Sequence, residues 1–279
     1  MKTYEYNFKN GKKMVLGKDP LVMGILNVTP DSFYDGGHYE TVEAAVKQAK
    51  KYEADGADII DIGAESTRPK AKPLTAKEEG TRLFPILEEI LRAVKVPVSI
   101  DTYHATTAEK ALKMGVSFIN DVNFNDSMAR VAAKYNVPVV VMARNTKGKP
   151  EKTRQNFVKL INIAKESGVS PENIILDPGI GFIGGADADT EALRNLKGIN
   201  KIDGEEYPLL VGLSRKSFLG KITGRNAVDL LAGTMAANAL AILCGANILR
   251  VHDVKEIVDV IAIVEKVKKQ YNVESLDDI

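Results

Sequence analysis

The chain has 279 residues, 44% of them hydrophobic, and its 38 basic and 37 acidic side chains leave a formal net charge of +1. This composition favours a large folded core over disorder, and the balanced charge argues against a nucleic-acid partner and against binding to an anionic membrane surface. The single cysteine, Cys244, excludes an intrachain disulfide and lies in an apolar run typical of a buried, unreactive thiol. The first residues lack the apolar core of a signal peptide, so we expect a cytoplasmic protein.

Residues 1–17 have the pattern of a short β-hairpin. Tyr4, Tyr6 and Phe8 alternate with polar residues, and Asn10-Gly11 is a strong turn signal before a second apolar run. We therefore predict an N-terminal hairpin extension at 1–17, placed at one end of a single larger domain at 18–279.

From residue 18 onward, short apolar runs alternate with helical patterns. Near-continuous apolar runs are typical of parallel strands that are buried on both faces. Eight such runs predict strands at 22–26, 58–62, 98–100, 118–120, 139–142, 174–176, 209–212 and 248–251. The helical spacing predicts helices at 41–54, 105–114, 127–135, 151–167, 191–196, 227–244 and 255–270. A capping box formed by Thr75 and Glu78 predicts the start of one more helix.

One stretch, residues 230–249, carries no charge over a length that could cross a bilayer. It contains Asn238, Asn247 and a Gly245-Ala246 break, which favour a buried helix followed by a buried strand. We therefore expect no membrane partner.

Eight β/α units without a break in composition predict an α/β fold, a closed (β/α)8 TIM barrel. An open doubly wound sheet is the alternative.

In a parallel barrel, the carboxyl ends of all strands lie on one face, where active sites are built. The predicted strands end in polar or chemically distinctive residues. This face should therefore gather Asn27, Asp61, Asp101, Asn120, Met142, Asp177, Ser214, Lys216, Arg250 and His252.

Three of these residues, Asp101, Asn120 and Asp177, form an acceptor-rich group with one amide. Such a group suits a flat heterocycle that presents amino and ring N–H donors inside an otherwise apolar pocket. The alternative is that each residue caps the helix that follows its strand.

A second group is cationic. Arg68, Arg250 and His252, together with Asn27, suit an anion with several oxygens, and Asn27 supplies an oxygen ligand for Mg²⁺. The alternatives are an ordinary surface ion pair for Arg250 and a structural histidine bonded to Asp253 for His252. Two long loops, at 28–38 and 63–74, either close over this face or are solvated turns.

With these residues assembled, the chain resembles the dihydropteroate synthase family, a group of pterin-binding TIM barrels. The matching motifs occur in the family's order at residues 24–33 (with Asp35-Gly36-Gly37), 61–69, 99–102, 119–122, 176–182, 212–218 and 250–253. The resemblance implies that 4-aminobenzoate displaces diphosphate from (7,8-dihydropterin-6-yl)methyl diphosphate in an SN1-like reaction, which gives 7,8-dihydropteroate for folate synthesis. It also implies Mg²⁺ as cofactor, small-molecule substrates, sulfonamides as inhibitors and a homodimer.

The resemblance assigns roles by motif. The catalytic residues would be Asp35, Arg68, Lys216, Arg250 and His252. The pterin would be held by Asp101, Asn120, Met142, Asp177, Gly212, Lys216 and Arg250. Diphosphate would contact Asn27, Thr67, Arg68, Arg250 and His252, with Asn27 as the metal ligand. Aminobenzoate would contact Phe33, Thr67, Pro69, Phe182, Lys216 and Ser217.

Two segments depart from the family pattern. After the fifth strand the family has Met-His-Met followed by a Gly-containing loop, whereas this chain has Met142-Ala143-Arg144-Asn145-Thr146-Lys147-Gly148. After Phe182 the family has Gly-Lys, whereas residues 183–187 here carry no cation. These departures leave two other functions open: a non-catalytic pterin-binding paralogue and a pterin-dependent methyltransferase.

Overall fold

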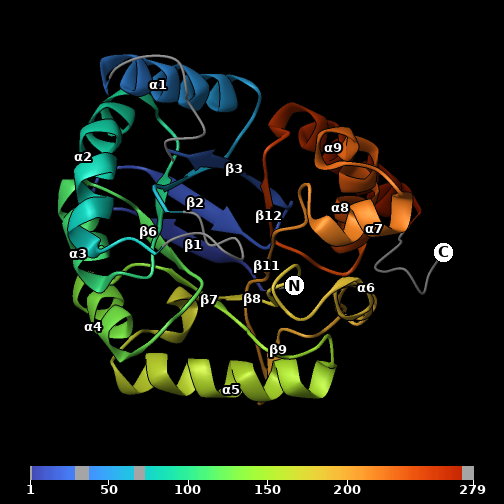
Figure 1. Ribbon diagram of the computed structural model, residues 1–279. Coiled ribbons are helices and arrows are strands. Elements are labelled where there is room, and N and C mark those ends of the chain that lie inside the picture. The colour runs from blue at the N-terminus through green and yellow to red at the C-terminus, as the bar shows by residue number, and fades with distance from the viewer. Residues whose placement is uncertain (1, 29–37, 66–72, 272–279) are drawn as a thin grey trace.

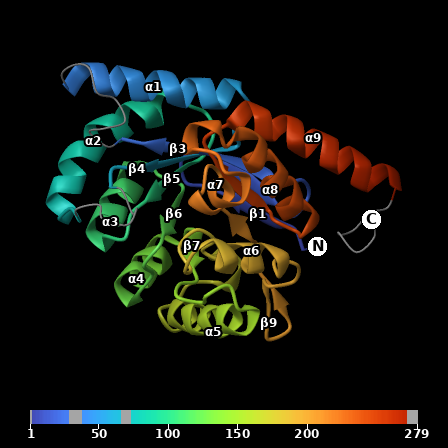
Figure 2. The same ribbon diagram turned by 45° about the vertical axis from the view of Figure 1, so that its right-hand side comes forward.

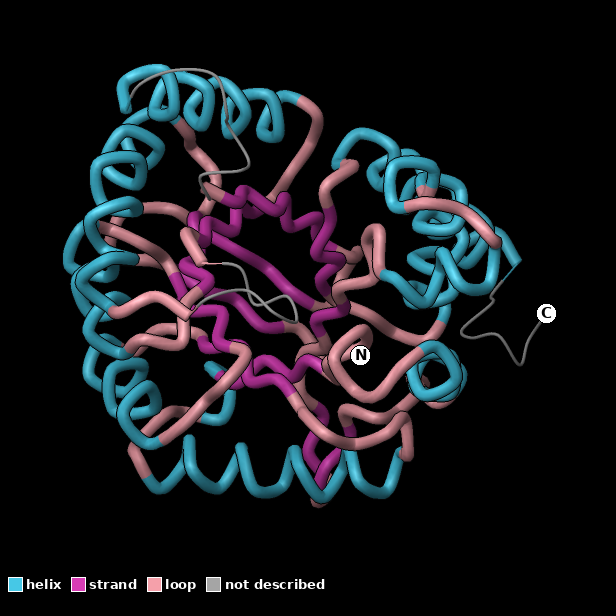
Figure 3. The backbone as a smooth tube through the Cα atoms, in the orientation of Figure 1, coloured by secondary structure: helices cyan, strands magenta, loops and turns pink. Residues whose placement is uncertain are grey.

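The computed structural model describes residues 2–28, 38–65 and 73–271. Eight parallel strands form one sheet in the order β11-β12-β3-β4-β5-β6-β7-β8. The sheet closes where Leu176 pairs with Leu209 and the Leu176 amide donates to the Pro208 carbonyl at 2.9 Å. The strands form a ring with the helices outside it (Figures 1 and 3), so the predicted TIM barrel is confirmed and the open sheet is wrong.

The barrel strands are short and buried. They are β3 (Leu21–Asn27), β4 (Ile59–Gly63), β5 (Val98–Asp101), β6 (Phe118–Asp121), β7 (Val139–Met142), β8 (Ile174–Asp177), β11 (Leu210–Val211) and β12 (Ile248–Val251). The helices around them are α1 (His38–Ala54), α2 (Ala76–Ala93), α3 (Ala105–Met114), α4 (Asp126–Tyr135), α5 (Pro150–Glu166), α6 (Ala186–Arg194), α7 (Ser217–Thr223), α8 (Leu231–Leu243) and α9 (Val254–Tyr271). Within the described ranges, short 3₁₀ helices occupy Pro171–Asn173 and Ala227–Asp229.

Local sequence signals explain several helix ends. The Thr75 hydroxyl accepts from the Glu78 amide, and the Glu78 carboxylate accepts from the Thr75 amide, which completes the predicted capping box of α2. Gly115 ends α3 with φ +114°, a conformation that favours glycine. Asn125 begins α4 by accepting from the amides of residues 127 and 128.

The N-terminal hairpin covers the amino end of the barrel. Strands β1 (Tyr4–Asn7) and β2 (Lys13–Leu16) pair antiparallel. Their inward side chains pack against the first inward-facing layer of the barrel, and the Tyr6 hydroxyl donates to the Glu172 carbonyl at 2.6 Å. This cluster contains Tyr4, Tyr6, Met14, Leu16, Met23, Ile59, Phe118, Val140, Ile175, Leu210 and Ile248.

Some expected boundaries were wrong. The helix expected at 227–244 is a 3₁₀ turn followed by α8, because helical geometry breaks at Leu230 (φ −90°, ψ 9°). The helix expected at 191–196 begins earlier, at Ala186, after two glycines with positive φ. A small hairpin, β9 (Lys201–Ile202) with β10 (Glu205–Glu206), was not expected, although its Asp203-Gly204 turn is a standard hairpin signal. In the described part of the chain, no helix combines the length and hydrophobicity that a bilayer crossing needs.

Candidate active site

The inward-facing side chains change from apolar to polar along the barrel axis. Ile59, Phe118, Ile175 and Ile248 belong to the apolar layer at the amino end. Since side chains of a strand alternate between its two faces, the residues two positions later face the same interior nearer the carboxyl end. These residues are Asp61, Asn120, Met142, Asp177, Gly212 and Arg250, and Asp101 follows Ser99 on β5 in the same way.

Arg250 is the centre of a buried ion-pair network. Its Nε lies 2.6 Å from Asp61 Oδ2, and its terminal nitrogen lies 2.6 Å from Asp101 Oδ2. Burial disfavours the charged guanidinium, but the carboxylates of Asp61 and Asp101 outweigh it and raise the pKa of Arg250. Arg250 is therefore not the surface ion pair of the alternative interpretation; two strands hold it inside the barrel mouth.

Asp61 has no exposed surface and connects four strands. It accepts from the Ser99 hydroxyl at 2.5 Å and from the Asn120 amide at 2.9 Å, in addition to Arg250. The sequence placed Asp61 at a strand tip but gave it no role. Its inward position two residues after Ile59 was the signal that could have identified it.

Asp101 and Asn120 lie side by side as register partners on β5 and β6. Burial raises the pKa of Asp101, and Arg250 opposes the shift. Asp177 lies on β8 beside Met142 of β7. Its Oδ1 accepts from the Gly179 amide at 2.7 Å, and burial again raises its pKa. The predicted acceptor-rich group is therefore gathered around one end of the barrel.

Lys216 lies at the amino end of α7 and reaches back over the mouth. Its ammonium lies 4.1 Å from the centroid of the Phe182 ring, a cation–π contact. Burial lowers the pKa of Lys216 to about 8; Asp177 opposes this shift and Arg250 adds to it. Lys216, Asp177 and Arg250 thus share one electrostatic environment.

His252 follows β12 directly, and the strand ends at Val251. Its Nδ1 lies 3.0 Å from the Ser214 hydroxyl, which also accepts from the His252 amide at 3.2 Å. Asp253, the partner considered for His252, instead binds Arg215 through both carboxylate oxygens, at 3.0 and 2.6 Å. Ser214 therefore orients the imidazole at the same mouth.

Other predicted residues occupy the rim or lie outside the described ranges. Asn27 ends β3 and is half-buried, whereas Ser217 begins α7 and is exposed. Gly212 has no side chain, which leaves space beside Arg250. A Cβ placed on Gly212 would lie 3.9 Å from the Arg250 Cβ. Phe33, Asp35, Thr67, Arg68 and Pro69 lie outside the described residues.

The first departure from the family pattern places an arginine on the rim. Arg144 is exposed and donates to Asn123 Oδ1 at 3.1 Å. Behind this loop, Asp121 is fully buried, and burial raises its pKa to about 7. Asp121 was not singled out by the sequence, because it lies on the helix-facing side of β6.

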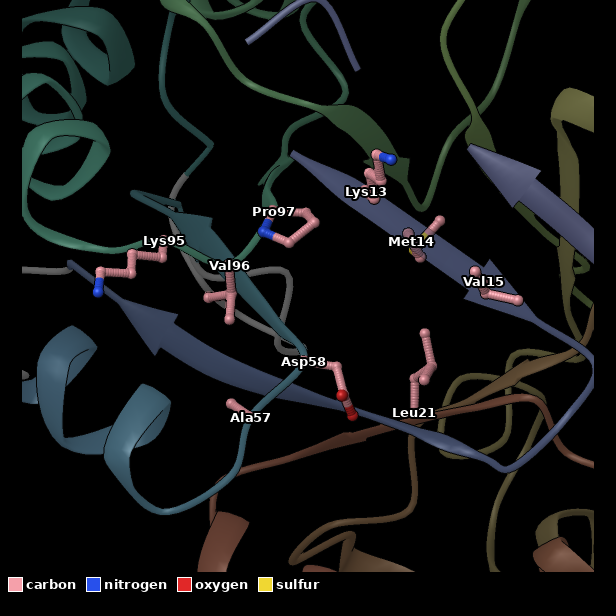
Figure 4. Close-up of a pocket in the computed structure, with 9 residues that line it drawn as sticks. All are labelled: Lys13, Met14, Val15, Leu21, Ala57, Asp58, Lys95, Val96 and Pro97. Atoms are coloured by element: carbon pink, nitrogen blue, oxygen red, sulfur yellow. The ribbon is translucent and has the colours of Figure 1, made fainter. Parts of the chain in front are cut away.

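A separate cavity of about 400 Å³ lies at the amino end of the barrel, between the hairpin and the base of the strands (Figure 4). Lys13, Met14 and Val15 of β2 line one side, and residues 57–58 and 95–97 line the other. It lies at the opposite end of the strands from Asp101, Asp177 and Arg250, so it is not part of the predicted site.

The chain is similar to proteins of one family over most of its length. The model of the family described as "Pterin binding enzyme" matches residues 23–252. Dihydropteroate synthase from Clostridium beijerinckii is 44% identical over 253 residues, which cover 88% of this chain and 93% of the relative.

Two solved structures with a similar fold are described as complexes with small molecules. Dihydropteroate synthase from Xanthomonas albilineans with 4-aminobenzoic acid aligns with a TM-score of 0.88 and 34% identity, covering 96% of this chain and 99% of that one. The same enzyme in complex with 7,8-dihydropteroate aligns with a TM-score of 0.82 and 34% identity, covering 91% and 96%. The chain belongs to the pterin-binding enzyme family, as a member of its dihydropteroate synthase group.

Proposed function

We propose that the protein catalyses the synthesis of 7,8-dihydropteroate and acts as a transferase of the pterinylmethyl group. The observation that carries the proposal is the ion-pair network at the barrel mouth, where Arg250 bridges Asp61 and Asp101 beside Lys216. This arrangement provides acceptors for a heterocycle and cations for its leaving group within one site. The named relatives support the same reaction.

The acceptor side of the site would bind the dihydropterin. Asp101, Asn120 and Asp177 offer oxygens toward amino and ring N–H groups, while Met142 and the space left by Gly212 accommodate the flat ring. Asp101 is already bonded to Arg250, so pterin binding would share or replace one of these hydrogen bonds.

The cationic side would stabilise the leaving group. The methylene C–O bond breaks with its electron pair going to diphosphate, and the aminobenzoate nitrogen then bonds to that carbon and releases a proton. Arg250, His252 and Lys216 lie where they can stabilise the departing charge before the new bond forms. The reaction needs no nucleophilic side chain from the protein.

Mg²⁺ is part of the proposal. Asn27 offers an amide oxygen at the end of β3, and Mg²⁺ is usually bound by few protein groups with water and substrate phosphates completing its shell. The residues present therefore fit an ion carried with the diphosphate. When bound, Mg²⁺ would neutralise charge on the leaving group.

Aminobenzoate would bind at the rim, against Phe182 and Ser217 and below Lys216. The relative with 4-aminobenzoic acid supports this substrate. The complex described as Yersinia pestis dihydropteroate synthase with a sulfonamide drug supports sulfonamides as competitors at the same place. The cytoplasmic location stays a prediction from the sequence.

A homodimer is also proposed, through the side of the barrel formed by α7, α8 and α9 (Figure 2). The exposed large hydrophobic residues of the described ranges all lie on these helices or on the 3₁₀ turn between α7 and α8. They are Ile222, Val228, Leu231, Leu240, Ile263 and Val267. An apolar surface of this kind marks an association site, and light scattering of wild type and of Ile263→Glu would test it.

The activity is tested by measuring diphosphate release with and without 4-aminobenzoate and Mg²⁺. We expect release only when both are present, and its loss in Lys216→Ala and Arg250→Ala with the fold intact. Lys221→Ala is the matched control, because Lys221 is an exposed cation at the other end of α7. Pterin binding without any product would instead indicate the non-catalytic paralogue, and methyl transfer to a corrinoid would indicate the methyltransferase.

A further inference from the structure

Asp189 is a buried carboxylate next to the site, and the proposed reaction does not use it. Asp189, in the first turn of α6, is 2% exposed. Its Oδ1 accepts from the Gly181 amide at 2.7 Å, eight residues earlier in the chain. A buried carboxylate that bonds a backbone amide fixes that amide in place.

The turn that Asp189 holds, Gly181–Phe182, lies directly against the Lys216 side chain. Gly181 has φ +95°, and a Cβ there would lie 2.6 Å from Lys216 Cδ and 2.9 Å from its Nζ. The next residue, Phe182, places its ring 4.1 Å from the same ammonium and donates its amide to the Gly179 carbonyl at 2.9 Å. The position of this turn therefore sets where the Lys216 side chain can lie.

The same carboxylate contributes charge. The groups that face Lys216 are Asp101, Asp177 and Asp189, which attract its ammonium, and Arg250, which repels it. Asp189 itself is attracted to Lys216 and Lys221. Burial raises the pKa of Asp189, and the Gly181 amide opposes that shift.

Helix α6 is itself held against the neighbouring loop. A Cβ at Gly148 (φ +72°) would lie 2.2 Å from the Ala188 carbonyl oxygen, so the loop after β7 passes against the residue that precedes Asp189. A Cβ at Gly184 would lie 3.9 Å from Lys147 Cγ. The two segments that depart from the family pattern are thus packed together, and this contact fixes α6 beside the site.

We propose that Asp189 is a positioning residue that holds the Gly181–Phe182 turn against Lys216 and keeps the ammonium over the rim where aminobenzoate binds. The identity of the substrate in this inference rests on the proposed function, whereas the effect on Lys216 rests on the position and charge of Asp189. Asp189 acts through Gly181 and Lys216 and touches neither substrate.

Two variants separate the geometric contribution from the charge. Asp189→Asn keeps an oxygen for the Gly181 amide and removes the charge, whereas Asp189→Ala removes both. We expect Asp189→Ala to raise the KM for 4-aminobenzoate about tenfold, with a smaller change in the KM for the pterin substrate. Asp189→Asn should largely keep the wild-type KM. Asp187→Asn and Asp187→Ala, in the same helical turn, are the matched controls and should leave both KM values unchanged.

A second measurement does not depend on activity. The Lys216 ammonium is titrated by carbon-13 NMR of labelled lysine side chains, with its signal assigned through Lys216→Arg. Because Asp189 attracts the ammonium, both Asp189 variants should lower the pKa of Lys216 relative to wild type, and the Asp187 variants should not. Circular dichroism confirms that each variant is folded, and the conservative Asn variant keeps the test available where Ala unfolds the protein.

The outcomes separate this inference from the proposed function. If wild type makes no dihydropteroate, the proposed function fails, and the titration still tests the link between Asp189 and Lys216. If wild type is active but the Asp189 variants keep the wild-type KM and Lys216 titration, the positioning role is overturned. Equal effects of the Asp187 and Asp189 variants would also overturn it. Both effects would then come from the loss of negative charge in the first turn of α6, and not from the contact between Asp189 and Gly181.

Discussion

Arg250 and Asp61 form an ion pair inside the barrel, with the arginine Nε 2.6 Å from Oδ2 of an aspartate that has no exposed surface. They come from β12 and β4, on either side of β3. The same guanidinium also binds Asp101, a predicted pterin-binding residue. We therefore expect a change at Asp61 to affect both the stability of the fold and the site.

Removing the Asp61 side chain should therefore lower the stability of the fold. We expect Asp61→Ala to lower the free energy of unfolding by about 3–5 kcal/mol, because it leaves a buried guanidinium without one of its partners. Urea denaturation monitored by circular dichroism measures this. Glu88→Ala breaks an exposed pair with Arg92 and should cost about 0–1 kcal/mol. Similar losses in the two variants would contradict the buried network.

The buried ammonium of Lys216 should make stability depend on pH. The folded-state pKa is lowered from 10.5 to about 8, chiefly by burial. Between these values the unfolded chain holds more protons than the folded one, so the unfolding free energy rises with pH. Compared with Lys216→Met, wild type should gain stability between pH 7 and pH 9.5. Urea titrations of both proteins at the two pH values measure the difference, and a constant difference would refute it.

Gly181 provides a test of crowding at the lysine. Alanine there has an unfavourable positive φ and also meets the Lys216 side chain. Gly115→Ala shares the positive φ but meets no atom within 4 Å. Both variants should lose about 1–3 kcal/mol of stability from backbone strain. Only Gly181→Ala should also lose turnover, by about a hundredfold, because it displaces Lys216. Steady-state kinetics at a temperature where both are folded distinguishes the two effects.

The hairpin should stabilise the barrel without affecting its chemistry. Leu16 is fully buried in the base layer, whereas Val15 beside it is half-exposed. We expect Leu16→Ala to cost about 2–5 kcal/mol and to keep wild-type kcat while folded, because it lies at the opposite end from Arg250. Val15→Ala should cost less. A changed kcat in folded Leu16→Ala would indicate that the base and the mouth are coupled.

Much of this architecture could be predicted because parallel strands have a strong signature. The eight apolar runs gave the barrel, and the polar residues that end them, such as Asp101 and Asp177, gave the position of the site. Strand alternation also explains why these residues share one interior. The roles assigned to them remain predictions that the variants above can test.

The rest depended on contacts between distant segments, which no local pattern reveals. The role of Asp61 is visible only once Arg250, 189 residues away, is seen to reach it. Asp189 lies in a helix whose start was placed too late, so its contact with Gly181 could not be anticipated. The strand after Pro208 has only two residues, and the sheet closes beside it through a single bridge between Leu176 and Leu209.

The tyrosines and aliphatic side chains packed under the strands have a consequence for ligand traffic. Because these side chains fill the amino end of the interior in the described part of the chain, we infer that ligands enter and leave the barrel at the strand tips. Where two ligands occupy it together, the deeper one can depart only after the shallower one. A reaction that joins them resolves this problem, because the pair then leaves as one molecule.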